Sequence, residues 1–166
     1  MNYSWLHGNR ISFMRILIVL TLLLISLPAL ADITGPARVV DGDTIWIGKT
    51  KIGIYGIDAP EQRQDCIRNS APWPCGFEST EHLRSFIGSS PVTCESYGRD
   101  LHGRMIGKCQ VNDLDIGAEM VSQGLALAFV RFSTDYVQNE RDARDLGNGM
   151  HAGTFVEPWV WRKKRR

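Results

Sequence analysis

The chain has 166 residues, which is long enough for one domain with a hydrophobic core. Its formal net charge is only +1 at pH 7, which excludes binding to nucleic acid through overall charge. Any affinity for nucleic acid must come from local patches of basic residues.

The N-terminal segment has the pattern of a secretory signal peptide. Arg10 and Arg15 occur without any acidic residue, residues 16–27 are almost entirely apolar, and residues 29–31 fit the small-residue cleavage rule. We therefore predict that residues 1–31 are a signal peptide and that the protein is secreted or periplasmic. An uncleaved membrane anchor is the alternative, but the apolar run is shorter than the ~20 residues that a membrane span needs.

Cleavage would leave residues 32–166 as one domain without a membrane segment. Met14 is an alternative start, because Met14 and Arg15 before the apolar run would suffice for export. The loss of two arginines and no acid changes the formal net charge from +1 to −1.

Two short acidic motifs flank a predicted β-hairpin. They are VVDGDT at residues 39–44 and YGIDAPE at residues 55–61. Residues 45–47 and 51–57 are predicted as strands joined by a turn at residues 48–49.

This hairpin would bring acidic side chains together. A turn near Lys49 places Asp41 opposite Ile57, and Asp41 shares a face with Asp43 because strand side chains repeat every second residue. The pairing therefore draws four carboxylates toward one place, those of Asp41, Asp43, Asp58 and Glu61.

Carboxylates crowded in this way repel one another unless a cation lies among them. Oxygen ligands from Asp and Glu suit Ca²⁺ or Mg²⁺ rather than zinc or copper. The motifs therefore predict a divalent-cation site at the end of the hairpin. The alternative is two acidic turns on a solvated surface, and spacing alone does not separate these two interpretations.

The cysteine pattern predicts two disulfides. An even number of cysteines in an exported protein favours pairing, and three connectivities are possible. Two of the cysteines flank a predicted hairpin centred near residues 101–102, and the other two bracket a proline-containing loop. We therefore favour the pairs Cys66–Cys75 and Cys94–Cys109. No CxxC motif occurs and the four histidines are scattered, so a zinc site is not expected.

The rest of the chain alternates between strands and helices. One helical spacing places Phe77, Thr80, Leu83 and Ile87 on a common inner face. The expected order is a lead-in at 32–37, the acidic hairpin, a polar loop at 61–74, a helix at 76–87, strands at 91–95 and 105–111, a helix at 115–123, an extended segment at 125–132, a helix at 135–146 capped by Ser133, and an irregular segment at 151–161.

Strands dominate the first half of the domain and helices the second, which indicates the α+β class. About five short strands with about three helices packed on one side suit a small closed barrel of the OB type. We interpret Trp159 and Trp161 as packing residues and the basic residues 162–166 as a solvated end, with contact to nucleic acid as the alternative.

Four motifs in this order resemble the thermonuclease (micrococcal nuclease-like) family. They are the two acidic motifs, DLHGR at residues 100–104 and VSQGLA at residues 121–126. The resemblance spans about residues 38–149, and the segments 74–76 and 158–162 resemble an exported bacterial branch of that family. It implies an OB-fold barrel with three helices and a Ca²⁺-dependent phosphodiesterase acting on DNA or RNA. We expect the protein to be a monomer.

The resemblance also implies a role for each site residue. The carboxylates of Asp43 and Asp58 and the carbonyl of Ala59 would bind Ca²⁺, and Asp41 would support them. Glu61 would orient or deprotonate the attacking water, which suits a carboxylate within reach of that water. Arg104 would contact the scissile phosphate, since a guanidinium offers paired hydrogen bonds to phosphate oxygens.

One position departs from the family pattern. The family has an arginine five residues before the second-motif aspartate, where this chain has Gly53. Lys51 and Arg99 are the candidate substitutes as phosphate contacts. We therefore expect a weakened nuclease whose activity an arginine at position 53 would raise. The alternative is a non-catalytic nucleic-acid-binding module, but the retained acidic cluster favours the enzyme.

Overall fold

The structure is a computed structural model that describes residues 32–165. The predicted signal peptide, residues 1–31, lies outside the described residues. No helix within residues 32–165 is long and apolar enough to cross a membrane.

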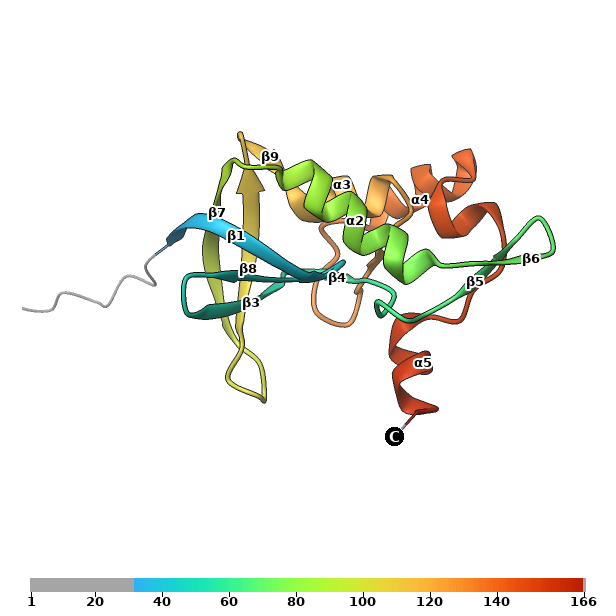
Figure 1. Cartoon of the computed structure of the whole chain (residues 1–166), viewed down its shortest axis with the longest axis horizontal. Coiled ribbons are helices and arrows are strands. Elements are labelled where there is room, and N and C mark those ends of the chain that lie inside the picture. Colours follow the sequence, from blue (N-terminus) through green and yellow to red (C-terminus); the bar gives the residue numbers. More distant parts are fainter. Residues whose placement is uncertain (1–31, 166) are drawn as a thin grey trace, which may run out of the picture. The chain divides into compact units, whose positions relative to one another are not determined.

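A five-stranded barrel forms the frame of the domain (Figure 1). Neighbouring strands pair antiparallel in the order β3-β2-β1-β7-β8, and β3 then pairs parallel with β8, which closes the ring. The α+β class and the five-stranded OB-type barrel are therefore confirmed. The barrel strands are β1 (Ile33–Asp41), β2 (Thr44–Ile47), β3 (Thr50–Ile54), β7 (Pro91–Arg99) and β8 (Met105–Val111).

Smaller strands extend this frame. β9 (Leu114–Asp115) continues the sheet beside β8, and β5 (Cys66–Arg68) pairs with β6 (Ala71–Trp73) in a separate ribbon. β10 (Leu127–Ala128) pairs with β4 (Ile57–Asp58), and this pairing fixes the backbone of the second acidic motif.

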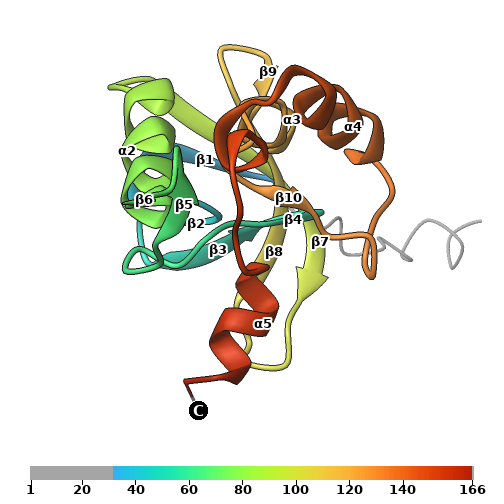
Figure 2. The same ribbon diagram turned by 90° about the vertical axis from the view of Figure 1, so that its right-hand side faces the viewer.

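Four α-helices are present within residues 32–165, one more than expected. Three of them occupy the predicted positions: α2 (Cys75–Ile87), α3 (Ile116–Ser122) and α4 (Val137–Leu146). The fourth is α5 (Pro158–Lys163), which follows a 3₁₀ turn, η1, at Gly149–Ala152. In both views α5 stands apart from the other three helices (Figures 1 and 2).

The expectation of an irregular C-terminal segment was therefore wrong. Proline is favoured in the first turn of a helix, and Pro158 occupies that position in α5. A helix of this length has little stability of its own. It is held by tertiary packing, because Pro158 is buried and Trp159 stacks on Phe129 with ring centroids 5.6 Å apart.

Three further expectations were wrong in detail. Residues 33–37 belong to β1 rather than to a lead-in, and only Leu127–Ala128 of residues 125–132 is a strand. The chain turns back after Ala128, where the Phe132 N–H donates to the Phe129 carbonyl. Phe77 is 50% exposed, because Gly76 rather than Phe77 lies on the buried stripe of α2 that continues through Thr80, Leu83 and Ile87.

Both expected disulfides are confirmed. Cys94 and Cys109 are directly opposite each other on β7 and β8, and their bond links two barrel strands. Cys66–Cys75 ties the β5–β6 ribbon to the start of α2. The second bond lies in a small core with Leu127 and Met150, against which Trp159 of α5 also packs.

A partly buried hydrogen bond joins α3 to the chain before α4. The Tyr136 hydroxyl lies 3.0 Å from each carboxylate oxygen of Asp115. Asp115 is also the N-cap of α3 and accepts from the Ala118 N–H. One carboxylate therefore orders a helix start and an inter-helix contact.

We predict that Tyr136→Phe lowers the free energy of unfolding by about 1.5–3 kcal/mol, the range for a hydrogen bond to a charged group. Urea denaturation measures the change. Tyr97→Phe is the matched control, because Tyr97 is 46% exposed and we expect no more than about 0.5 kcal/mol from a surface substitution. Equal losses in the two variants would contradict the assignment.

Candidate functional site

A groove of about 1170 Å³ crosses the barrel surface. It is bordered by α5 and by the loop between β7 and β8, which project from the same side of the domain in both views (Figures 1 and 2). The groove gathers nearly all the side chains singled out in the sequence. Its charged lining includes Asp41, Asp43, Asp58, Glu61, Lys51, Arg99, Arg104 and Arg162.

Asp43 lies in the tight turn between β1 and β2. Its carboxylate accepts from the Ala59 N–H at 3.0 Å and from the Thr44 hydroxyl at 2.8 Å. A Cβ atom at Gly42 would lie 2.0 Å from the Ser79 Oγ. The Asp-Gly-Asp sequence is thus explained by a turn that packs directly against α2 and points Asp43 at the second acidic motif.

The acidic motifs meet, but by a different route from the one expected. Asp41 pairs with Thr44 across the β1–β2 turn rather than lying opposite Ile57. That expectation was wrong because Asp41 ends a separate strand before the β2–β3 hairpin begins. The convergence instead depends on the bond from the Ala59 N–H to Asp43.

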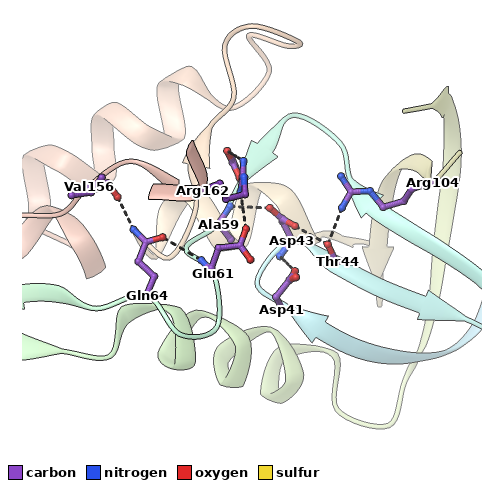
Figure 3. Close-up of polar contacts among 10 residues, drawn as sticks. Asp41, Asp43, Thr44, Ala59, Glu61, Gln64, Arg104, Val156 and Arg162 are labelled. Atoms are coloured by element: carbon purple, nitrogen blue, oxygen red, sulfur yellow. Dashed lines mark hydrogen bonds and ion pairs between the residues drawn. The ribbon is translucent and has the colours of Figure 1, made fainter. Parts of the chain in front are cut away.

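Asp58 is the most enclosed of these acids, with 3% of its surface exposed. Its two carboxylate oxygens accept from Nη1 and Nη2 of Arg162 at 2.9 and 2.7 Å. The same Nη1 also donates to Glu61 Oε1 at 3.0 Å. A single guanidinium on α5 therefore bridges two acids of the second motif (Figure 3).

The acids affect one another's ionisation. Burial, followed by the charge of Asp43, raises the pKa of Asp41 to about 7. Burial raises the pKa of Asp58 to about 6; the hydrogen bond from Arg162 lowers it, and the charge of Asp43 raises it further. The surrounding protein therefore does not fully stabilise the charged forms of Asp41 and Asp58.

The acidic cluster offers oxygen donors to a metal ion but not a complete metal site. Within residues 32–165, no three His, Cys, Asp or Glu side chains form a ready-made metal site. The available oxygens are nevertheless those that hard cations prefer, and the cationic guanidinium of Arg162 already lies among them. The residues thus suit a hard cation, which would share Asp58 with Arg162 or displace it.

Arg104 lies on the other side of Asp43 from Arg162 (Figure 3). Its Nη1 donates to the Thr44 hydroxyl at 3.1 Å and its Nε to Asp100 at 3.0 Å. A Cβ atom at Gly53 would lie 2.9 Å from Cζ of Arg104. The guanidinium of Arg104 therefore covers the place where the family arginine would begin.

Lys51 and Arg99, the two expected substitutes for that arginine, both line the groove. Arg99 donates to the Gly103 carbonyl at 2.8 Å and so braces the β7–β8 loop. Lys51 is exposed on β3. In the described part of the chain, neither makes a polar contact with the four carboxylates.

Two site residues were missed from the sequence. The expectation that Arg162 lies in a solvated end is wrong, since its guanidinium pairs with Asp58 and Glu61. Gln64 is fully buried; its amide donates to the Val156 carbonyl at 2.6 Å and accepts from the Glu61 N–H at 3.3 Å. The available signals were the need of the acidic cluster for a cation and the PWVWR motif with its helix-starting proline.

The chain is similar in sequence to known and predicted nucleases. A family model described as "Staphylococcal nuclease homologue" matches residues 51–152. An "Uncharacterized endonuclease" of Escherichia coli O157:H7 is 36% identical over 164 residues, covering 92% of this chain and 100% of the relative. "Probable staphylococcal-like nuclease CAN2" of Oryza sativa subsp. japonica is 32% identical over 127 residues, covering 75% of this chain and 32% of the relative.

A third relative, an "Uncharacterized endonuclease" of Haemophilus influenzae, is 28% identical over 137 residues, with 78% of this chain and 72% of the relative covered. The family model takes in Asp58, Glu61 and Arg104, and the barrel carries them at the rim of one groove. The chain therefore belongs to the staphylococcal nuclease homologue family.

Proposed function

We propose that the protein is a Ca²⁺-dependent nuclease that hydrolyses phosphodiester bonds in DNA and RNA outside the cytoplasm. The observation that supports this best is the groove itself, which Asp43, Asp58, Glu61 and Arg104 all line, with Arg104 on the far side of Asp43 from Glu61. Two disulfides support an oxidising compartment.

The carboxylates of Asp43 and Asp58 and the carbonyl of Ala59 would hold Ca²⁺. When bound, Ca²⁺ neutralises phosphate charge and aligns the phosphate for attack. Asp41 keeps the β1–β2 turn in place by accepting from the Asp43 N–H at 3.2 Å. Each of these residues therefore acts by position and charge rather than by forming a covalent bond.

Glu61 acts as the general base in this proposal. Its carboxylate takes a proton from a water molecule as the water oxygen attacks phosphorus. The bond from phosphorus to the leaving oxygen then breaks, and that oxygen takes a proton from solvent, while Glu61 returns its proton to solvent. Arg104 stabilises the extra negative charge on the phosphate oxygens with parallel hydrogen bonds. The reaction consumes one water molecule for each bond cleaved.

Aromatic rings in the groove suit a single-stranded substrate. Tyr55 and Tyr97 have ring centroids 4.3 Å apart, and those of Phe129 and Phe132 are 4.9 Å apart. All four line the groove. Stacking on such rings tolerates any base, and contacts to the backbone carry no sequence information, so we infer cleavage with little sequence preference.

The alternative of a non-catalytic binding module rests on Gly53 alone. It leaves the acidic cluster unexplained, because a protein that only binds a polyanion gains nothing from burying Asp58 beside Asp41 and Asp43. The nuclease is the better account of these residues.

We predict that the purified protein cleaves fluorogenic single-stranded DNA and RNA with Ca²⁺ and that a chelator abolishes the cleavage. Asp43→Ala and Glu61→Gln should each lower kcat/KM by at least about 10²-fold, the scale of losing one catalytic group. Glu78→Gln, which removes an exposed carboxylate on α2, should match the wild type. Binding without cleavage in both conditions would support the binding module instead.

The raised pKa of Asp41 predicts a pH-dependent cost to stability. The unfolded chain loses this proton near pH 3.8 and the folded chain near pH 7, so the stabilising contribution is complete below about pH 4 and is lost as pH rises to about 7. In chelator, the free energy of unfolding of Asp41→Asn, measured relative to that of the wild type, should therefore be about 2–4 kcal/mol higher at pH 7.5 than at pH 4. Urea denaturation at both pH values tests this, and parallel pH profiles would contradict it.

An arginine at position 53 is predicted to raise nuclease activity, but any side chain at this position would also displace Arg104. The experiment therefore needs a control for that displacement. Gly53→Ala already forces that guanidinium to shift, since the new Cβ would lie 2.9 Å from its Cζ. We expect Gly53→Arg to exceed Gly53→Ala in kcat/KM by at least about 10-fold, because it adds a phosphate-binding guanidinium. Equal activity of the two variants would show that position 53 does not reach the phosphate.

A further inference from the structure

Arg162 lies where the acidic cluster opens into the groove. Its guanidinium donates three hydrogen bonds, two to Asp58 and one to Glu61. Its side chain is 36% exposed, whereas that of Asp58 is 4% exposed. The side chain therefore contacts the acids and also lines the groove.

The unused donors of this guanidinium share one edge. An arginine has five N–H donors in a fixed planar arrangement. Both Nη1 hydrogens and one Nη2 hydrogen are directed at Asp58 and Glu61. The remaining two, on Nε and Nη2, have no acceptor among residues 32–165 and point in parallel. Two parallel N–H groups match the spacing of two oxygens of a phosphate.

The chain holds α5 firmly enough to present this edge. Gln64 links the backbone of Glu61 to the Val156 carbonyl, so the segment before α5 is fixed to the loop that carries the proposed base. Pro158 is buried and Trp159 packs in the disulfide core and against Phe129. Arg162 therefore reaches the site from a braced helix rather than from a free tail.

We propose that Arg162 is the second phosphate-binding residue of the site: its Nε–Nη2 edge binds the substrate phosphate while Nη1 positions Glu61. This rests on the proposed nuclease function and adds a residue to it. Gly53 carries no side chain to fill that role, and Arg104 lies on the opposite side of Asp43 (Figure 3). Two guanidinium groups would then flank the phosphate from α5 and from the β7–β8 loop.

Arg162 can lose its contacts with Asp58 and still keep its contact with Glu61. A cation bound at Asp58 would compete with Arg162 for the oxygens of that residue. The bond to Glu61 and the Nε–Nη2 edge do not depend on Asp58. A guanidinium that stays bonded to Glu61 and also binds the phosphate holds the base close to the reacting group. Such positioning raises the reaction rate.

Binding without metal tests the phosphate contact separately from catalysis. The probe is a fluorescein-labelled single-stranded oligothymidylate in chelator, followed by anisotropy at several salt concentrations. Arg162→Met should weaken binding at least about 10-fold and lower the salt slope by about 1. Lys163→Met removes the same charge from the next residue, which is exposed, and should weaken binding less than about 3-fold. Equal effects of the two variants would overturn the proposal.

Catalysis with Ca²⁺ gives the second measurement. Arg162→Met should lower kcat/KM by about 10²–10³-fold, as for loss of one donor to a developing oxyanion, and Lys163→Met should not. Unchanged or increased activity of Arg162→Met would overturn the proposal, because it would make Arg162 a latch that only blocks the acids. If the wild type is inactive, the nuclease assignment fails, and the binding experiment still decides the phosphate contact.

Arg162→Lys covers the case in which Arg162→Met does not fold. A lysine keeps the charge opposite Asp58 but lacks the two parallel donors. We expect its thermal midpoint to stay near that of the wild type and its kcat/KM to fall at least about 10-fold. Wild-type activity in this variant would contradict a role for the planar edge.

Discussion

Negative charge gathered at the end of a small barrel is the constraint on which the site depends. Asp41, Asp43 and Asp58 lie close enough that burial and mutual repulsion raise the pKa of two of them. Burying carboxylates is costly unless hydrogen bonds and cations compensate. Here the compensation comes from backbone N–H groups, from the Thr44 hydroxyl and from Arg162.

Three segments that are distant in sequence supply this arrangement. The β1–β2 turn contributes Asp43, β4 and the loop after it contribute Asp58 and Glu61, and α5 contributes Arg162. The closed ring of strands fixes the first two relative to each other, and the β4–β10 pairing holds the backbone at Asp58. A rigid frame with functional residues at its ends is the usual means of fixing a reactive geometry.

The C-terminal helix changes how the missing family arginine is understood. Gly53 leaves a space that Arg104 covers, and Arg162 approaches the same acids from the other side. In our account the site has relocated a guanidinium from a barrel strand to α5. The disulfide core and Gln64 then matter for function, because they hold the helix that carries it.

The sequence predicts those features that depend on local pattern. Strand and helix periodicity locates four of the five barrel strands, all but β1, and three helices. Cysteines opposite each other across a hairpin predict Cys94–Cys109. Acidic motifs of this kind also indicate the carboxylate cluster. The contact between Arg162 and Asp58 is different, since it joins residues 104 positions apart and has no periodic signal. The exposure of Phe77 and the turn that isolates Asp41 likewise depend on packing that a single strand or helix does not encode.

Calorimetric titration of Ca²⁺ into the purified, oxidised protein tests the central claim most directly. The account predicts saturable binding of one ion that Asp43→Ala abolishes and Glu78→Gln leaves unchanged. An absence of Ca²⁺ binding by the wild type, even with an oligonucleotide present, would contradict it.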